Sequence, residues 1–440
     1  MPKINLQRFL KLLPEEYRMP YEKGWAHNYA VEAEEVTKNY KFASSITFSD
    51  TTCRDGEQQV GVVFTPEQKV EIVQLLGEVG ISLVEVGYPG VSKEEERACK
   101  MITANAPKAI CFVMARANKN DIDAALRADA KMLDLFTSCS EFHIREKMGL
   151  TPEENINKYL ELLDYATDHG LMIIFGMEDI SRSDIDYYVK IIKAVKEAAG
   201  NRWAGTGISD TTGSFNPLSA KWFYRTVQDK LGDVALGMHF HNDLGLATAN
   251  TLACLEEGAA ACQGTILGLG ERCGNTPLEE VLVALRAIYG LKLRIKYDKL
   301  VELCDLVSKY AGIPIPVNKP IVGMNAFRHE SGIHAHGVLA NPHIYEFIPH
   351  DLLGRKSEFA FGKFSGTAVV LEEVLAPHGI KPSKEQLREI VLKVKDLQEK
   401  REAEKAQIKE KFVQNYYDTI RRMALSLDEV LEIAKSVMNK

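Results

Sequence analysis

The stretch VALGMHFHND, residues 234–243, is a short apolar run with polar side chains that begin where the run ends. Between residues 44 and 290 the chain repeats this pattern in seven further runs, which begin at Ser45, Ser82, Ala109, Lys131, Leu171, Ala204 and Ala261. Near-continuous apolar runs of this kind are typical of parallel strands that helices cover. We therefore predict eight parallel strands.

Helical patterns separate the predicted strands. Residues 65–68 (TPEQ), 92–95 (SKEE) and 151–154 (TPEE) predict capping boxes, in which side-chain oxygens accept from free backbone N–H groups at a helix start. Pro217 fits the first position of a helix, and Gly80 fits a left-handed helix end. The chain thus alternates strand and helix eight times.

Two folds satisfy this alternation, an open doubly wound sheet and a closed barrel. Polar residues follow the C-terminal end of each predicted strand, and in a barrel these ends converge on one mouth. We therefore predict an α/β fold, a (β/α)8 TIM barrel over residues 44–290. We expect an N-terminal extension at 1–43, a mixed linker subdomain carrying HESGIH at 291–370 and a helical C-terminal region at 371–440.

Composition excludes several classes of protein. The formal net charge of -7, with interspersed charges of both signs, argues against a nucleic-acid partner. No run approaches 18 apolar residues, so we expect no membrane span. The eight cysteines contain no C-x-x-C pair, which is typical of reduced thiols, and we predict a cytoplasmic protein.

His239 and His241 predict a metal site at the end of the seventh strand. Residues two apart in a strand point to the same face, so both imidazoles can reach one ion. They need an anionic ligand to hold a divalent cation while leaving positions open for a substrate. The segment DTTCRDGEQ, residues 50–58, supplies carboxylates beside Arg54. A non-catalytic metal-binding or interaction protein is the alternative to an enzyme.

Five segments of the chain carry a family resemblance. They are DTTCRDGEQ (50–58), HFHNDLGLATANTLACLEEGA (239–259), GLGERCGNTPLEE (268–280), HESGIHAHGVL (329–339) and LLGRKSEFAFGKFSG (352–366). Together they resemble the 2-isopropylmalate synthase and homocitrate synthase family of metal-dependent barrel enzymes, in order, over about residues 44 to 370.

The resemblance implies a set of metal ligands. Asp55, His239 and His241 match the ligands of the family, and Asn275 is a candidate for a fourth. The divalent ion, Zn, Mn or Mg, would chelate a 2-oxo acid through its carboxylate and ketone oxygens. Arg54 would stabilise the negative charge that develops during the reaction.

The resemblance also implies a base for the methyl group of acetyl-CoA. A histidine from the segment after the barrel, reaching the mouth of the partner subunit in a homodimer, is implicated together with a glutamate on the barrel. His334 and Glu178 are the matching positions, and His329 and His336 remain alternatives.

Further positions match substrate contacts of the family. Gln58, His143 and Thr211 match positions on the side of the 2-oxo acid, and Tyr345 matches a tyrosine near the acyl donor. Arg145 could form a bidentate pair with a distal carboxylate, which favours a dicarboxylic acceptor.

The predicted function is a Claisen-type condensation of acetyl-CoA with a small 2-oxo acid, giving a 2-hydroxy di- or tricarboxylate and CoA. Candidate acceptors are 2-oxoglutarate, 2-oxoisovalerate, pyruvate and oxaloacetate. A lyase or aldolase on the same barrel is the alternative, but HESGIH and GKFSG after the barrel favour condensation. The long synthases carry a β-rich regulatory domain where this chain has a helical pattern, so we expect no leucine feedback through such a domain.

Overall fold

The structure is a computed structural model that describes residues 28–438 except 106, 107 and 233. The predicted N-terminal extension therefore lies outside the described residues up to position 27. The chain divides into two compact units, which are described separately. Among the described residues, the first comprises 28–59 and 63–315, and the second comprises 60–62 and 316–438.

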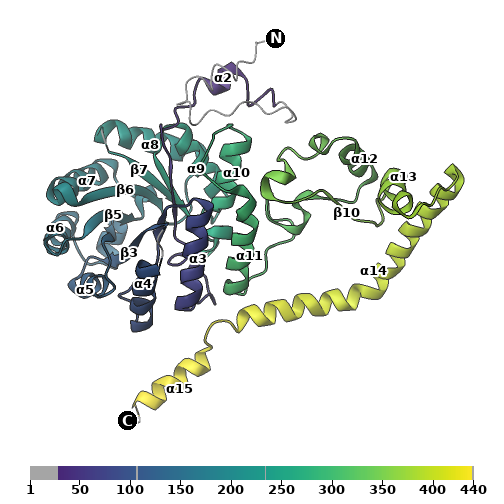
Figure 1. Ribbon diagram of the computed structural model, residues 1–440. Helices are drawn as coiled ribbons and strands as arrows, with labels where there is room; N and C mark the ends of the chain where they lie inside the picture. The colour runs from purple at the N-terminus through teal and green to yellow at the C-terminus, as the bar shows by residue number, and fades with distance from the viewer. Residues whose placement is uncertain (1–27, 106–107, 233, 439–440) are drawn as a thin grey trace. The chain divides into compact units, whose positions relative to one another are not determined.

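The first unit is the predicted barrel (Figure 1), with eight parallel strands in sequential order around a closed ring. The strands are β1 (Thr47–Asp50), β2 (Leu83–Glu85), β3 (Ile110–Arg116), β4 (Met132–Ser138), β5 (Met172–Glu178), β6 (Trp203–Asp210), β7 (Leu236–Phe240) and β8 (Ala261–Gly264). The ring closes where β1 pairs with β8, with Thr47 opposite Ala261 and Asp50 opposite Gly264. The prediction of eight parallel strands is confirmed.

Helices surround the strands (Figure 1). They are α3 (Pro66–Val79), α4 (Lys93–Asn105), α5 (Lys119–Arg127), α6 (Pro152–Asp168), α7 (Ile185–Ala199), α8 (Pro217–Leu231), α9 (Ala247–Glu256), α10 (Leu278–Ala287) and α11 (Leu300–Ala311), and the short α2 (Glu34–Thr37) precedes β1. Among the described helices, none is long and apolar enough to cross a membrane.

Helix ends follow the capping signals in the sequence. Thr65 and Thr151 form complete capping boxes at the starts of α3 and α6. Pro217 opens α8, and Gly80 ends α3 with a left-handed φ of 111°. These local signals therefore set the helix boundaries before any tertiary contact is considered.

The third predicted capping box, at Ser92, forms only in part. The Glu95 backbone N–H donates to Ser92 Oγ at 3.1 Å, but the Glu95 carboxylate accepts from Lys69 Nζ at 2.7 Å instead. Lys69 is fully buried and also pairs with Glu57 at 2.6 Å. Because a buried ammonium needs anionic partners, this requirement overrides the local cap.

The barrel unit ends later than the sequence pattern indicated. The predicted end at residue 290 falls after α10, but the first unit extends to residue 315 and includes α11. The reason is packing, since Leu303, Cys304 and Val307 form a buried apolar face on α11.

The second unit is mostly helical. Its elements are β9 (Arg328–His329), α12 (Gly332–Ala340), β10 (Glu358–Phe359), α13 (Thr367–Val370), α14 (Lys384–Arg421) and α15 (Leu427–Met438), with β9 and β10 paired in parallel. A small core of Ala335, Val369, Val370, Leu375 and Val391 joins α12 and α13 to the start of α14.

Candidate metal centre

The end of β7 presents two imidazoles to one point. His239 lies in β7 and His241 follows the strand directly, and their Nε2 atoms are 3.4 Å apart. Asp55 Oδ2 lies 3.5 Å from His239 Nε2 and 4.0 Å from His241 Nε2. All three ligand atoms lie within 4.8 Å of one another, so the structure brings together the three residues that the sequence pointed to.

Backbone hydrogen bonds hold the loop that carries Asp55. The Asp55 N–H donates to Thr51 O at 2.8 Å, and the Thr51 N–H donates to Gly264 O on β8 at 2.9 Å. Thr52 Oγ1 accepts from the Ile266 N–H at 2.8 Å. The loop after β1 is thereby attached to β8, which places its carboxylate opposite β7.

Arg54 lies between two carboxylates. Its Nη1 donates to Asp55 Oδ2 at 2.8 Å, and its Nη2 donates to Glu85 Oε2 at 2.9 Å. Glu85, on β2, is fully buried and also accepts from Thr51 Oγ1 at 2.7 Å. Burial alone would lower the pKa of Arg54, but Glu85 and Asp55 outweigh it and raise that pKa. The guanidinium is therefore a fixed positive charge beside the candidate metal centre.

The pKa shifts of Asp55, His239 and His241 favour an ionised carboxylate and neutral imidazoles, the forms that bind a cation. Burial would raise the pKa of Asp55, but Arg54 and the two histidines hold it well below its usual range. Burial lowers the pKa of His239 to about 3 and also lowers that of His241. At neutral pH the cluster therefore offers one carboxylate and two neutral imidazole lone pairs.

Asn275 lies beside this cluster. Its backbone forms an isolated β-bridge with His241, and its Nδ2 donates to Leu269 O at 3.0 Å. A Cβ atom at Gly270 would lie 2.2 Å from Asn275 Nδ2 and 3.2 Å from Asp55 Oδ1. Only glycine therefore leaves room at position 270 for both side chains.

Unsatisfied polar atoms support a candidate cation site at this point. Asp55 Oδ1 and Asn275 Oδ1 are buried, and neither has a hydrogen-bond partner among the described residues. Buried oxygens of this kind are costly unless an ion or a water satisfies them. Two imidazoles, a carboxylate and an amide oxygen fit a divalent cation and admit Zn, Mn or Mg.

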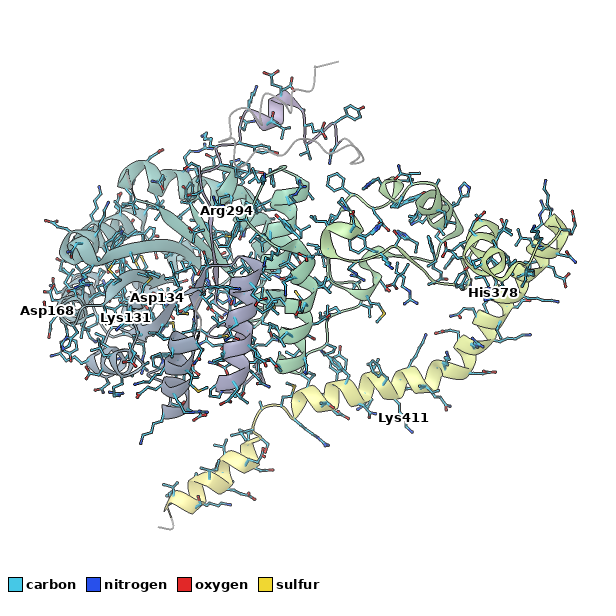
Figure 2. The ribbon with its side chains drawn as sticks, viewed as in Figure 1. Lys131, Asp134, Asp168, Arg294, His378 and Lys411 are labelled. Carbon is cyan, nitrogen blue, oxygen red and sulfur yellow. The ribbon has the colours of Figure 1, made fainter. Side chains whose placement is uncertain are left out.

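A cavity of about 410 Å³ lies on the barrel axis and is lined by residues of all eight strands, His239 among them. Asp134, which Figure 2 labels, faces it from β4. Burial, with the nearby Glu85 carboxylate, raises the pKa of Asp134. A methyl group at Gly176 would lie 2.1 Å from Asp134 Oδ1, so this glycine provides the space for the carboxyl group.

Four other predicted site residues follow the strands of the barrel. The Asp179 N–H donates to Thr211 Oγ1 at 2.8 Å, and Asp179 Oδ2 lies 3.6 Å from His143 Nε2. Glu178 Oε2 accepts from Ser138 Oγ at 3.2 Å. Gln58 Oε1 lies 3.5 Å from Arg54 Nη1 and so next to the metal cluster. Asp179 contacts Thr211 through its backbone N–H and His143 through its fully buried carboxylate, and it was not among the predicted site residues.

Arg145 lies on a short π-helical turn, residues His143–Lys147, with an exposed side chain. Its guanidinium pairs with Glu141 one turn earlier at 2.7 Å. This pair is a surface interaction of small energy. The structure thus provides no buried partner position for the distal carboxylate that we assigned to Arg145.

The second unit separates the three candidate histidines. His334 is exposed and its ring stacks on Tyr345, with centroids 4.1 Å apart and planes 24° apart. His329 Nε2 instead lies 2.9 Å from Glu346 Oε1, a buried carboxylate that also contacts His350 Nδ1 at 2.8 Å. His336 is exposed, and no hydrogen bond of its side chain is seen in the described structure. His329 is therefore occupied by a structural partner, and His334 is accessible.

These features define a closed (β/α)8 barrel with a candidate divalent-cation site at its mouth. The HMGL-like family model matches residues 45–307, and a homocitrate synthase post-HMGL domain-like model matches residues 321–402. The chain belongs to the HMGL-like family, and the expected family is confirmed. The distal part of α14 and the whole of α15 lie beyond both matches.

Relatives extend the likeness to most of the chain. A 2-isopropylmalate synthase of Methanocaldococcus jannaschii is 40% identical over 367 residues, which cover 82% of this chain and 70% of the relative. A homocitrate synthase AksA of the same organism is 40% identical over 352 residues, covering 80% and 86%. A solved HMG-CoA lyase structure from Bacillus subtilis has a TM-score of 0.56 at 20% identity over 62% of this chain and 96% of that one, which supports the fold alone.

Proposed function

We propose that this protein condenses acetyl-CoA with a small 2-oxo acid in a reaction that depends on a divalent metal. The observation that carries the proposal is the cluster of Asp55, His239 and His241 with the Arg54 guanidinium beside it. Relatives named as 2-isopropylmalate synthase and homocitrate synthase support a synthase over a carbon–carbon lyase.

The residues divide the chemistry among them. A bound divalent ion would polarise the ketone of the acceptor and orient it. Arg54 Nε is buried and has no hydrogen-bond partner in the described part of the chain, so it can donate to the oxygen that becomes negative. A base removes a methyl proton of acetyl-CoA, the methyl carbon bonds to the ketone carbon, and the ketone oxygen gains a proton. Water then cleaves the C–S bond, which releases the acid and CoA.

We assign the base to His334 of a partner subunit, with Glu178 on the barrel. His334 is exposed and its imidazole stacks on Tyr345, whereas Glu346 engages His329. A mixture of Arg54→Gln and His334→Asn chains tests this assignment. Each variant alone should be inactive, and exchange of subunits should restore about a quarter of the activity. No recovery in verified mixed dimers would contradict a base supplied by the partner.

The main test is an assay of free thiol released from acetyl-CoA. The panel contains 2-oxoglutarate, 2-oxoisovalerate, pyruvate and oxaloacetate, because the exposed pair of Arg145 with Glu141 gives no reason to prefer a dicarboxylic acid. We expect one acid to stimulate release, chelator to stop it, and His239→Ala to abolish metal-dependent turnover in a folded protein. If no acid stimulates release but 3-hydroxyacyl-CoA thioesters are cleaved to acetyl-CoA and a carbonyl compound, the protein is a lyase.

A further inference from the structure

The cavity on the barrel axis, which we call the axial cavity, is open on one side of the barrel interior. In barrels of this kind, bulky branched side chains usually fill the interior in layers. Here four residues without a long side chain line the cavity from β6, β7 and β8, namely Gly205, Gly207, Gly237 and Ala261. A Cβ atom at Gly205 would meet no atom of another part of the chain within 4 Å. The sequence therefore builds this cavity of about 410 Å³, which has the size of a site for a small molecule.

The axial cavity reaches the candidate metal centre, because His239 lines the cavity and is one of the three candidate ligands. In the proposed function, an acceptor held at a cation by its carboxylate and ketone oxygens directs its remaining side chain away from that cation. The candidate ligands come from β7 and from the loops after β1 and β7, on either side of β8, and β4 lies opposite β8 in the ring of eight strands. The side chain of the acceptor would therefore extend across the axial cavity towards β4.

Asp134 is the residue that β4 presents to the axial cavity (Figure 2). Its Oδ1 atom is buried and has no hydrogen-bond partner among the described residues. Burial, followed by the Glu85 carboxylate, raises the pKa of Asp134 to about 8, although Arg54 opposes this shift. A negative charge is therefore already costly on this side of the cavity.

The lining of the axial cavity offers no lysine or arginine to a second carboxylate, as far as the described residues go. Arg54, beside the candidate metal centre, already pairs with Asp55 and Glu85. Burying a carboxylate without a partner is costly. Leu83 and Ile174, by contrast, give the cavity apolar surface. The lining thus favours an acceptor with an uncharged side chain.

We propose that the axial cavity receives the side chain of the acceptor and selects 2-oxo acids whose side chain is an uncharged alkyl group, with Asp134 excluding a distal carboxylate. This inference rests on the proposed function and deepens it. Among the four candidate acceptors it favours 2-oxoisovalerate and pyruvate over 2-oxoglutarate and oxaloacetate. The discriminating group is thus a carboxyl inside the barrel and not Arg145, which lies on the surface.

Binding of acids to the full chain loaded with Mn²⁺ tests the cavity without turnover. Calorimetric titration compares two pairs of acids that match in shape, 2-oxoglutarate with 5-methyl-2-oxohexanoate and oxaloacetate with 4-methyl-2-oxopentanoate. The members of each pair differ only in a distal carboxylate against an isopropyl group. We expect the alkyl acid of each pair to bind at least about tenfold more tightly. Equal or tighter binding of a dicarboxylic acid would overturn the proposal, as would failure of all four acids to bind. Alkyl acids that bind with this preference but release no thiol from acetyl-CoA would support the cavity and contradict the condensation.

A cation placed in the axial cavity should reverse the preference. Ile174 on β5 is the cross-strand neighbour of Asp134 and also lines the cavity. In the double variant Asp134→Asn, Ile174→Lys, 2-oxoglutarate should gain at least about tenfold in affinity relative to 5-methyl-2-oxohexanoate. The matched control, Asp134→Asn with Ile174→Met, should still prefer the alkyl acid because it adds a side chain of similar length without a cation. Circular dichroism verifies that both variants are folded. A folded lysine variant with the selectivity of the control would show that the acceptor does not enter the cavity and would overturn the proposal.

Discussion

Lowering the pH from 7 to 5 should weaken the affinity of the candidate metal centre for Mn²⁺ by less than a single ordinary histidine ligand would. Protons and metal ions compete for the same imidazole lone pairs. Burial lowers the pKa of His239 to about 3, so this imidazole takes up no proton in this range. Burial also lowers the pKa of His241, which therefore takes up less proton than an ordinary histidine. The Asp55 carboxylate remains ionised because Arg54 and the histidines hold its pKa well below its usual range.

The expected magnitude follows from the titration of an ordinary histidine. With a pKa of about 6.5, one ligand histidine would weaken the apparent affinity about 25-fold between pH 7 and pH 5. His239 should contribute almost nothing to such a loss and His241 less than an ordinary histidine, so we expect a total change of less than about 25-fold. The dissociation constant can be measured by calorimetric titration of metal-free protein with Mn²⁺ at pH 5, 6 and 7.

Stability must be followed in the same samples. The folded-state pKa of His239 lies below the unfolded value, so its contribution to stability is complete above about pH 6.5 and is lost as pH falls toward 3. At pH 5 the free energy of unfolding is lower by about 2 kcal/mol, which should leave the protein folded. Circular dichroism at pH 5 checks this. A 25-fold or larger fall in affinity of folded protein would refute the reasoning from buried, neutral imidazoles.

Two substitutions test the surroundings of the metal. Gly270→Ala should weaken metal binding about 10- to 100-fold because the new methyl group displaces Asn275. The matched control is Gly149→Ala, since Gly149 also has a left-handed φ but open space around it. This variant should cost only about 1 kcal/mol of stability and leave metal affinity unchanged. Glu85→Gln removes the charge that holds Arg54 Nη2, so urea unfolding should show a loss of about 1–2 kcal/mol and turnover should fall. Full turnover in this variant would show that Arg54 keeps its place without that charge.

Local patterns account for most of the fold. The strands were visible because each is a short apolar run followed by polar residues, and helix starts such as Thr65 and Thr151 carry their own hydrogen-bond partners. The end of the barrel unit was missed because α11 has the composition of an ordinary helix, and only its packing assigns it to the first unit. The sequence could not predict that the Glu95 carboxylate pairs with Lys69 instead of completing the capping box, because Lys69 lies on another helix.

The site was predictable only where its residues cluster in the sequence. His239 and His241 stand two apart, and Asp55 follows Arg54, so short segments pointed to them. Glu85 lies alone in the apolar strand LVE, and Asp134 lies alone in MLDLFTS. A single carboxylate at an inward position of a buried strand is the signal that could have identified both, because burying such a group is costly without a partner.

The attachment of the loop after β1 to β8 has a consequence for folding. The first and last strands, β1 and β8, pair over only four residues. The Asp55 carboxylate follows β1 and faces His239 of β7, which lies beyond β8. An ion bound by these side chains would link β1 to β7 across the pairing of β1 with β8. The ion would bind the closed barrel and not a barrel in which β1 has separated from β8. Adding divalent metal to the purified protein should therefore raise the melting temperature and slow the separation of these strands, even without substrate.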